Sequence, residues 1–387
     1  MEAVEAKAAP LPDDPTTGEK PAVLIIGGLG YTGQFLAKYI HENHLASELR
    51  LVDKHLPELA WVAPEFKEAV SRDRFVQADA SREQSFPRIF DRTNGNEFDY
   101  VFNCGGETRF SQEDDVYKVR SYDLSMAVGK ECARRKIKCY VENSTGMVYK
   151  PESTPRKETD KLKPWSKLAK WKLQAEEDLE KIEGLNLLVL RVAHVYGPYT
   201  RKFLSTALCM ARVYQSMGKE MRWLWKESLK TNMVHVDDVV RALWTGVEWY
   251  GKASSLPRKP APVFNIVDHG NTSQGTTASL IQQVFDIKTG FHSTLISAFA
   301  RLNLDHVVDD VNDETLDPWA DLQSKAGISQ TTPLSPFMEK ELLKDTDLCL
   351  DGSLFEKETG FTYKHEKITK ELMEEIIESY KVMGWWP

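Results

Sequence analysis

The stretch VLIIGGLGYTG at residues 23–33 joins a short apolar run to a glycine-rich turn. This pattern is typical of a buried strand, a tight turn and the start of a helix. Its glycines fit the spacing G-x-x-G-x-x-G, which allows the turn, lets a pyrophosphate approach the backbone and packs the helix on the strand. N–H groups at such a helix start attract anions. A dinucleotide site is therefore predicted at Gly27, Gly28, Leu29, Gly30, Tyr31, Thr32 and Gly33.

A second apolar strand, at 49–52, ends in Asp53, twenty residues after Gly33. A carboxylate at this position accepts the ribose hydroxyls of a dinucleotide and repels a 2′-phosphate, so NAD is the predicted cofactor. NADP stays open as an alternative because Lys54 is adjacent. An ordinary solvated carboxylate at a strand end is the structural alternative for Asp53.

Two further strands end in small or acidic residues that are also predicted to contact the cofactor. The strand at 74–77 leads to Asp79 and Ala80, and the strand at 98–102 leads to Cys104, Gly105 and Gly106. Small residues at these strand ends allow a cofactor to approach the backbone, although an ordinary turn explains them equally well.

Strands are predicted near residues 22, 49, 74, 98, 137 and 186, with amphipathic segments between them. This alternation predicts an α/β fold, a Rossmann-type doubly wound parallel sheet. Long helices are expected at 116–136 and 165–183, the second with (i, i+4) charge pairs such as Lys172 with Glu176.

Past Arg191 the pattern is less regular. It predicts a strand at 234–236 that enters a helix through an aspartate cap at Asp237 or Asp238, a strand at 263–266, an apolar helix at 294–304, an acidic loop at 309–317 and a final helix from about 368. The predicted division is a disordered tail at 1–20, a Rossmann domain at 21–192 and 232–255, and a smaller substrate-binding lobe at 193–231 and 256–387.

The composition of the chain argues against several classes of partner. Fifty basic and fifty-eight acidic residues give a net charge of −8, which disfavours nucleic acid as a partner. Five scattered cysteines without a C-x-x-C pair predict reduced thiols, no metal site and a cytoplasmic location. No apolar run approaches the roughly 20 residues that cross a bilayer, and the N-terminus lacks the features of a signal peptide. A small-molecule substrate is therefore expected.

Together these motifs resemble the extended short-chain dehydrogenase/reductase family, in its NAD-dependent epimerase/dehydratase branch, over residues 21–270. The resemblance rests on the glycine turn, Asp53, STGMVY at 144–149, Lys172 with Glu176, LRVAHVYGP at 190–198 and VHVDDV at 234–239. It implies that Thr145 holds the substrate oxygen, that Lys172 binds the nicotinamide ribose, that His194 lies at the cofactor, and that helices 116–136 and 165–183 form a homodimer.

One departure from the family concerns proton transfer. The family uses a Tyr-x-x-x-Lys pair, in which a neighbouring ammonium lowers the pKa of the phenol. Alignment on Lys172 and Glu176 places Leu168 at the tyrosine position. An alternative register with Lys170 as the lysine places Ser166 there and loses the glutamate. Tyr149 is the nearest other candidate for a proton donor, although a tyrosine at this position is ordinary in the family.

Further departures bear on the substrate. Arg120 stands where the family commonly has a structural asparagine, and Thr231 stands where its nucleotide-sugar enzymes carry an arginine for the diphosphate, which disfavours a nucleotide sugar. Trp223, Trp225 and the apolar helix around Leu295, Ile296 and Phe299 suit a bulky or apolar ligand, or an ordinary core.

Two functions follow from these patterns. The first is an NAD-dependent oxidoreductase or epimerase that acts on an alcohol or ketone, with the proton relayed by water or another residue. The alternative is a catalytically silent NAD(P)-binding scaffold or sensor that works through partners.

Overall fold

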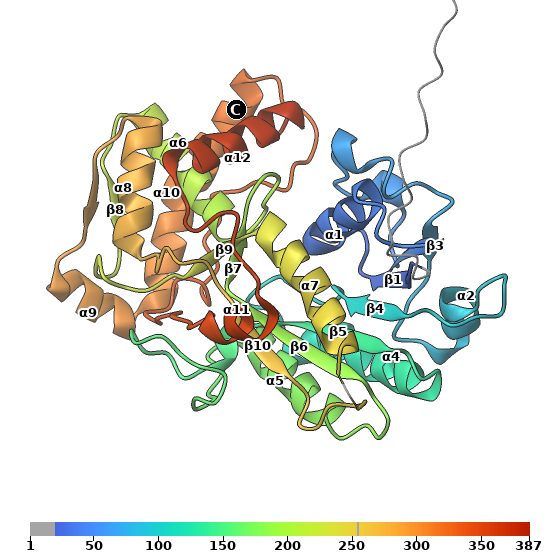
Figure 1. Ribbon diagram of the computed structural model, residues 1–387. Helices are drawn as coiled ribbons and strands as arrows, with labels where there is room; N and C mark the ends of the chain where they lie inside the picture. The colour runs from blue at the N-terminus through green and yellow to red at the C-terminus, as the bar shows by residue number, and fades with distance from the viewer. Residues whose placement is uncertain (1–19, 254) are drawn as a thin grey trace, which may run out of the picture.

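The computed structural model describes residues 20–253 and 255–387, so the predicted tail lies outside the described residues except for Lys20. Its centre is a seven-stranded parallel sheet in the order β10-β6-β5-β4-β1-β2-β3 (Figure 1). This confirms the predicted Rossmann-type α/β fold. Its strands are β1 (Ala22–Ile26), β2 (Glu48–Asp53), β3 (Phe75–Gln77), β4 (Tyr100–Asn103), β5 (Cys139–Thr145), β6 (Leu187–Val192) and β10 (Val263–Ile266).

The sheet is covered on both faces, and its first strand is apolar throughout. In β1 all five residues are buried; Val23 and Ile25 join one hydrophobic core, and Leu24 and Ile26 join the other. Such continuous apolar runs are expected for strands of a parallel sheet between two helical layers. The doubly wound arrangement therefore follows from the same short run that precedes the glycine turn.

The helices of the sheet domain differ from prediction in one respect. The segment expected as one helix at 116–136 contains a π-helical turn, Lys118–Tyr122, between α3 and α4. The elements are α1 (Tyr31–Glu42), α2 (Phe86–Phe90), α3 (Asp114–Tyr117), α4 (Asp123–Arg134), α5 (Lys167–Leu179) and α7 (Val236–Gly251), with 3-10 turns at Pro57–Leu59, Pro64–Phe66, Glu83–Ser85 and Gly146–Val148.

Most of the remaining elements form a lobe, part of which lies at the left of Figure 1. Two small parallel sheets pair β7 (His194–Tyr196) with β9 (Met233–His235), and β8 (Met221–Trp223) with β11 (Thr289–Phe291). The lobe helices are α6 (Leu204–Met217), α8 (Gln274–Phe285), α9 (Thr294–Leu302), α10 (Leu304–Lys325) and α12 (Lys370–Val382). Helix α11 (Ser353–Thr359) instead packs on β10 and α7.

Two predictions about this part of the chain need correction. The acidic loop expected at 309–317 is wrong, because these residues lie inside α10, whose buried Val308, Asn312 and Thr315 recur at helical spacing. In addition, β10 pairs with β6 in the main sheet, although the predicted division placed residues 263–266 in the lobe.

Two further observations concern the chain as a whole. All five cysteines are free thiols, as predicted. Within residues 20–253 and 255–387, no helix combines the length and apolar character needed to cross a membrane.

Candidate active site

The glycine turn, Asp53 and Cys104–Gly106 meet at the carboxyl edge of the sheet. Gly27 donates its N–H to the Val52 carbonyl at 2.8 Å, and Cys104 donates to the Ile26 carbonyl at 2.9 Å. Gly27 has φ +73°, and a Cβ there would lie 2.6 Å from the Gly105 Cα, so this close approach requires glycine. The parallel topology thus brings the predicted cofactor residues of β1, β2 and β4 together.

The helix that follows the turn leaves its first N–H groups open. Gly30, the N-cap of α1, provides no side-chain cap. A Cβ on Gly33 would overlap the Gly27 carbonyl oxygen, so glycine at 33 allows the helix to lie against the turn. Tyr31 and Thr32 form the first turn of α1. This edge therefore presents unpaired backbone donors and the positive end of a helix dipole, as an anion site requires.

The two acidic residues predicted to contact the cofactor, Asp53 and Asp79, both accept hydrogen bonds from nearby turns. Asp53 accepts N–H bonds from Leu29 at 3.3 Å and from His55 at 3.1 Å, so it ties β2 to the glycine turn. Asp79 accepts from the Ser81 N–H at 3.1 Å and hydroxyl at 2.7 Å, and Ala80 beside it is buried. Lys54 is exposed.

Lys172 extends from α5 toward the end of β5. Its Nζ donates to the Asn143 carbonyl at 2.6 Å and lies 3.5 Å from the buried Glu142 carboxylate. Glu142 in turn accepts hydrogen bonds from Asn103 at 2.8 Å and Tyr140 at 2.7 Å. The predicted ion pair of Lys172 with Glu176 is therefore wrong, because the lysine pairs with β5.

Glu176 instead neutralises a buried arginine of β6. Arg191 donates to its carboxylate from Nε at 3.0 Å and from Nη2 at 2.6 Å, and the Ser144 hydroxyl donates to the other carboxylate oxygen. The third donor of Arg191 reaches the Tyr149 hydroxyl at 2.8 Å, which itself donates to Asn265 at 2.8 Å.

The position of Tyr149 argues against the predicted role as proton donor. Its side chain is buried, and both hydrogen-bonding partners of its hydroxyl are fixed protein groups. Burial raises the pKa of Tyr149 to about 12, even beside the Arg191 guanidinium. A general acid or base works best with a pKa near the operating pH. We therefore interpret Tyr149 as part of the network that holds α5 to the sheet.

The start of α5 distinguishes the two possible registers. Ser166 is the N-cap, and its hydroxyl accepts the Ala169 N–H at 3.1 Å. The Lys170 side chain is 62% exposed and lies 3.5 Å from Asp114, whereas Lys172 is 12% exposed and points to β5. Leu168 is buried one turn before Lys172. The geometry thus favours the register that places Leu168 at the tyrosine position.

The end of β5 is covered by a C-terminal segment that no sequence pattern predicts at this position. Thr145 is buried, and its hydroxyl accepts the Met147 N–H at 3.2 Å. The Leu350 side chain packs on Gly146 so closely that a Cβ on this glycine would overlap it. Glu341 accepts N–H bonds from Ser111 at 2.9 Å and from Lys167 at 3.1 Å, so the same segment also closes over the start of α5.

Several side chains near these strand ends are half-buried, and burial shifts their pKa values. Burial raises the pKa of the Cys104 thiol to about 12 and lowers the pKa of His194 to about 4. Burial also raises the pKa of Tyr31 and lowers that of Lys202 to about 8. The His194 ring stacks on Phe203 at a centroid distance of 3.8 Å. The loop before α6 thus lies beside His194 and beside Thr108 in the loop after β4.

A sequence model of the NAD dependent epimerase/dehydratase family matches residues 23–259. The chain belongs to this family. NAD is therefore its cofactor, as the sequence predicts. No curated protein matches the chain.

Solved structures of similar fold cover nearly the whole chain. The enzyme WbmG from Bordetella bronchiseptica, solved with NAD and UDP, is 13% identical, with a TM-score of 0.65 over 95% of this chain and 97% of its own. UDP-glucose 4-epimerase from Thermotoga maritima, solved with UDP-glucose, is 18% identical, with a TM-score of 0.63 over 93% and 98%. The UDP-N-acetylglucosamine 4-epimerase from Methanobrevibacter ruminantium is 15% identical, with a TM-score of 0.63 over 94% and 99%. These similarities support the fold.

The family motif at 234–239 starts α7 differently from prediction. The N-cap is His235, whose Nδ1 accepts the Asp237 N–H at 3.2 Å, so the predicted aspartate cap is wrong. Asp238 is fully buried and accepts the N–H groups of Lys364 and His365, each at 2.8 Å. The motif therefore caps the helix and anchors the C-terminal segment.

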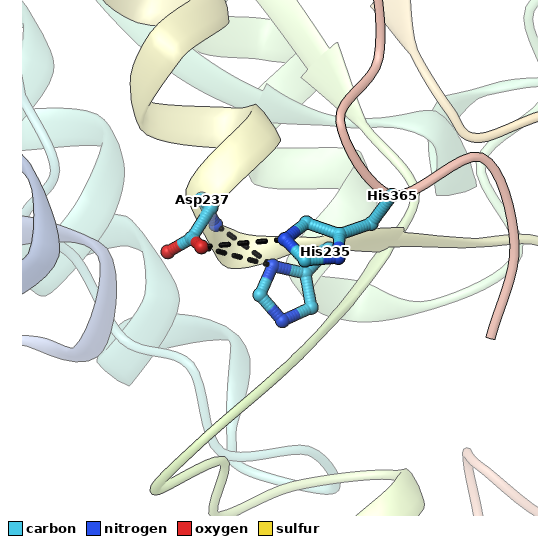
Figure 2. A group of neighbouring side chains, drawn as sticks. All are labelled: His235, Asp237 and His365. Atoms are coloured by element: carbon cyan, nitrogen blue, oxygen red, sulfur yellow. Dashed lines mark hydrogen bonds and ion pairs between the residues drawn. The ribbon is translucent and has the colours of Figure 1, made fainter. Parts of the chain in front are cut away.

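Figure 2 shows that His365 completes a group of three potential metal ligands with His235 and Asp237. His365 Nε2 lies 3.4 Å from an Asp237 carboxylate oxygen. However, the two rings stack at 3.8 Å with a tilt of 35°, and the lone pair of His235 Nδ1 already accepts the cap hydrogen bond. Metal-binding imidazoles point free lone pairs at one ion. We therefore interpret the group as a helix cap, and the absence of a metal site stays a prediction.

The aromatic and apolar residues predicted to cover an apolar ligand are either packed in a small core or exposed to solvent. Trp225 is buried in a small core and donates to the Leu343 carbonyl at 2.7 Å, while Trp223 in β8 is half-buried. In α9, Leu295 is 79% and Phe299 is 58% exposed to solvent. Ile296 is exposed as well. The expectation of an apolar substrate site built from these residues therefore lacks support.

Arg120 and Thr231 also have structural partners. Arg120 donates to Glu107 in the loop after β4 at 2.8 Å. Thr231 is buried, pairs with Leu348 in a short bridge and donates its N–H to the Thr272 carbonyl at 2.9 Å. Thr231 is therefore a buried residue of the lobe, and its proposed correspondence to the diphosphate arginine stays a prediction.

Proposed function

We propose that the chain is an NAD-dependent oxidoreductase or epimerase of an alcohol or ketone that works without the family tyrosine. Lys172 is proposed to bind the nicotinamide ribose, and Thr145 to orient the substrate oxygen. Leu168 stands at the tyrosine position and carries no proton, so a water molecule or a group of the substrate must deliver it. NAD, when bound, supplies the hydride acceptor.

One observation carries this proposal. The Lys172 ammonium is held at the end of β5 by the Asn143 carbonyl and Glu142, while Leu168 fills the site one turn earlier. These two fixed contacts hold the ammonium at the strand end where the nicotinamide ribose is proposed to bind. The predicted cofactor residues also stand at one edge of the sheet.

Turnover with a panel of secondary alcohols and ketones separates this proposal from the silent scaffold. Reduced nicotinamide would be followed by its absorbance, in the wild type and in Thr145→Ala, Leu168→Tyr and Leu168→Phe. We expect activity that falls in Thr145→Ala and rises in Leu168→Tyr, since a positioned acid or base contributes about 10²- to 10⁴-fold. Leu168→Phe is the matched control, because it adds the ring without the hydroxyl.

The scaffold alternative predicts a different result. It requires NAD binding by the wild type together with no turnover of any alcohol or ketone, and no gain in Leu168→Tyr. That outcome would overturn the enzymatic proposal while leaving the cofactor site intact.

We also propose a homodimer in which α4 and α5 of two copies pack as a four-helix bundle. Val119, in the π turn that precedes α4, is 54% exposed, which supports an apolar contact at this face. Sedimentation of the purified protein tests this point. A dimer is expected, and a monomer at micromolar concentration would overturn the proposal.

A further inference from the structure

A buried carboxylate, Glu142, lies beside the Lys172 side chain in β5. Alternate side chains of a strand share one face of the sheet, and here Tyr140, Glu142 and Ser144 share the face that α4 and α5 cover. Strands of a parallel sheet are normally apolar on both faces. Glu142 is 1% exposed, and a buried charge is costly unless it is paired, so its presence requires an explanation.

Each oxygen of the Glu142 carboxylate faces one hydroxyl and one group that can only donate. Oε1 accepts from the Ser125 hydroxyl at 3.1 Å and lies 3.5 Å from the Lys172 ammonium. Oε2 accepts from the Tyr140 hydroxyl at 2.7 Å and from Asn103 Nδ2 at 2.8 Å. Burial and then the charge of Glu142 raise the pKa of Tyr140 well above its usual value, so this hydroxyl remains a donor.

Asn103 connects the same carboxylate to the turn after β4. Its Oδ1 accepts the Gly105 N–H at 3.1 Å, which orients the amide so that Nδ2 faces Glu142. Gly27 of the glycine turn packs directly on Gly105. Glu142 therefore joins two parts of the proposed cofactor site, Lys172 on α5 and the turn at Gly105.

This network favours a carboxylate over a neutral amide. A glutamine at 142 would turn its NH₂ group toward either the Lys172 ammonium or Asn103 Nδ2, and neither of these groups can accept a hydrogen bond. Two donors would then face each other in a buried site, which leaves them unsatisfied. In the described part of the chain, Lys172 is also the only cation that pairs with Glu142.

Lys172 keeps one donor after its protein contacts. An ammonium has three donors. The Asn143 carbonyl takes one at 2.6 Å, and Glu142 is the partner of a second. Over residues 20–253 and 255–387, no other protein group accepts from this nitrogen. The third donor is therefore left for a group outside the protein, and the first two contacts fix its direction.

We propose that Glu142 is a positioning residue that directs the third donor of Lys172 at the nicotinamide ribose of NAD. The inference rests on the proposed function, which gives Lys172 that contact. Because Glu142 is buried, it acts on the cofactor through the lysine and not by direct contact. Loss of its charge should therefore weaken the binding of NAD but not of ADP, which lacks the nicotinamide ribose.

The test is calorimetric titration of the full chain with NAD and with ADP, in the wild type, Glu142→Gln, Lys172→Met and the double variant. Glu131→Gln is the matched control, because Glu131 is a buried carboxylate of α4 that pairs with Arg134 and Arg135 instead. Thermal unfolding of each variant verifies that it is folded. If Glu142→Gln does not fold, Glu142→Asp replaces it, since aspartate keeps the charge but is one methylene shorter and withdraws from the lysine.

The inference predicts a loss of affinity that depends on the lysine. Glu142→Gln should weaken NAD binding by about tenfold, the loss of one charge-assisted contact, and should leave ADP binding within about twofold. In the Lys172→Met background the same substitution should weaken NAD binding by less than a further twofold or so, because the group that it positions is absent. Glu131→Gln should lower the melting temperature and change neither affinity.

Three results would overturn the inference. Equal losses of NAD and ADP affinity in Glu142→Gln would make Glu142 a structural residue of the sheet. A loss of NAD affinity that persists in the Lys172→Met background, or that Glu131→Gln reproduces, would show that Glu142 does not act through the lysine. If Lys172→Met weakens NAD binding but Glu142→Gln changes it by less than about twofold, the Asn143 carbonyl alone positions the ammonium.

Failure of the proposed function gives a different pattern. If Lys172→Met leaves NAD affinity unchanged, the proposed contact between the lysine and the ribose is wrong, whatever Glu142→Gln does. A wild type that binds NAD but turns over no alcohol or ketone would refute the proposed enzymatic function. It would leave the role of Glu142 standing, since these titrations measure binding alone.

Discussion

Substitution of Glu176 by glutamine should destabilise the protein by about 3–5 kcal/mol, the cost of leaving one member of a buried ion pair without its partner. Glu176 and Arg191 are each 5% exposed, and two hydrogen bonds of 2.6 and 3.0 Å join them. Unit charges roughly 4 Å apart interact by about 4 kcal/mol at an effective dielectric constant of about 20. Glutamine has the size of glutamate, so little packing is lost and the change reports the charge.

Urea-induced unfolding, followed by tryptophan fluorescence and far-UV circular dichroism, measures this change. The exposed pair of Lys381 and Glu378, 3.1 Å apart, supplies the control. Glu378→Gln should cost less than about 1 kcal/mol, because solvent already screens that pair. In the double variant Glu176→Gln with Arg191→Met, part of the stability should return, because no buried charge is left unpaired.

A loss below about 1 kcal/mol in Glu176→Gln, in the range of exposed pairs, would refute this reasoning. It would mean that the carboxylate is not the counter-charge of Arg191. The assignment of Lys172 to the family's lysine and of Leu168 to the tyrosine position would then lose support, since both residues lie in α5, the helix that Glu176 holds against the sheet.

Two further predictions concern charge and close contact. Burial lowers the pKa of His235 from 6.5 to about 4. The unfolded chain therefore binds more protons in that range, and the free energy of unfolding should fall as pH drops from 6.5 to 4. His235→Asn, which keeps a capping side chain, should lessen this fall, whereas an unchanged pH profile of unfolding would contradict the assignment. In Gly33→Ala the added methyl group would overlap the Gly27 carbonyl oxygen, so both the NAD affinity and the melting temperature should drop. An unaltered NAD titration would show that the turn tolerates a side chain at residue 33.

Local patterns predicted the sheet and the cofactor edge well. The apolar run before Gly27 specified a strand buried on both faces, and parallel topology then placed Asp53 and Cys104–Gly106 beside it. The spacing of Lys172 and Glu176 marked the right helix, but not their partners. Each side chain pairs with a buried residue of the sheet instead, Glu142 or Arg191, because an uncompensated buried charge costs more than a surface pair returns.

Features that depend on distant parts of the chain could not be predicted. Glu341 and Leu350 reach the end of β5 and the start of α5 across more than 170 residues, and no local pattern signals such a contact. The helix at 304–325 was not predicted at residues 309–317, because its buried face includes Asn312 and Thr315. In an acidic run such polar residues are typical of a loop. His235 was not predicted as the N-cap of α7, because histidine is not among the preferred N-cap residues.

The most direct test of the account is a calorimetric titration of the purified protein with NAD and NADP in both redox states, repeated with Lys172→Met. We expect NAD to bind more tightly than NADP, because the Asp53 carboxylate is predicted to accept the ribose hydroxyls and to repel a 2′-phosphate. We expect Lys172→Met to weaken NAD binding by about tenfold or more, the loss of one charge-assisted hydrogen bond. Tighter binding of NADP would contradict the role of Asp53. No binding of either cofactor would contradict the central claim that this site binds NAD.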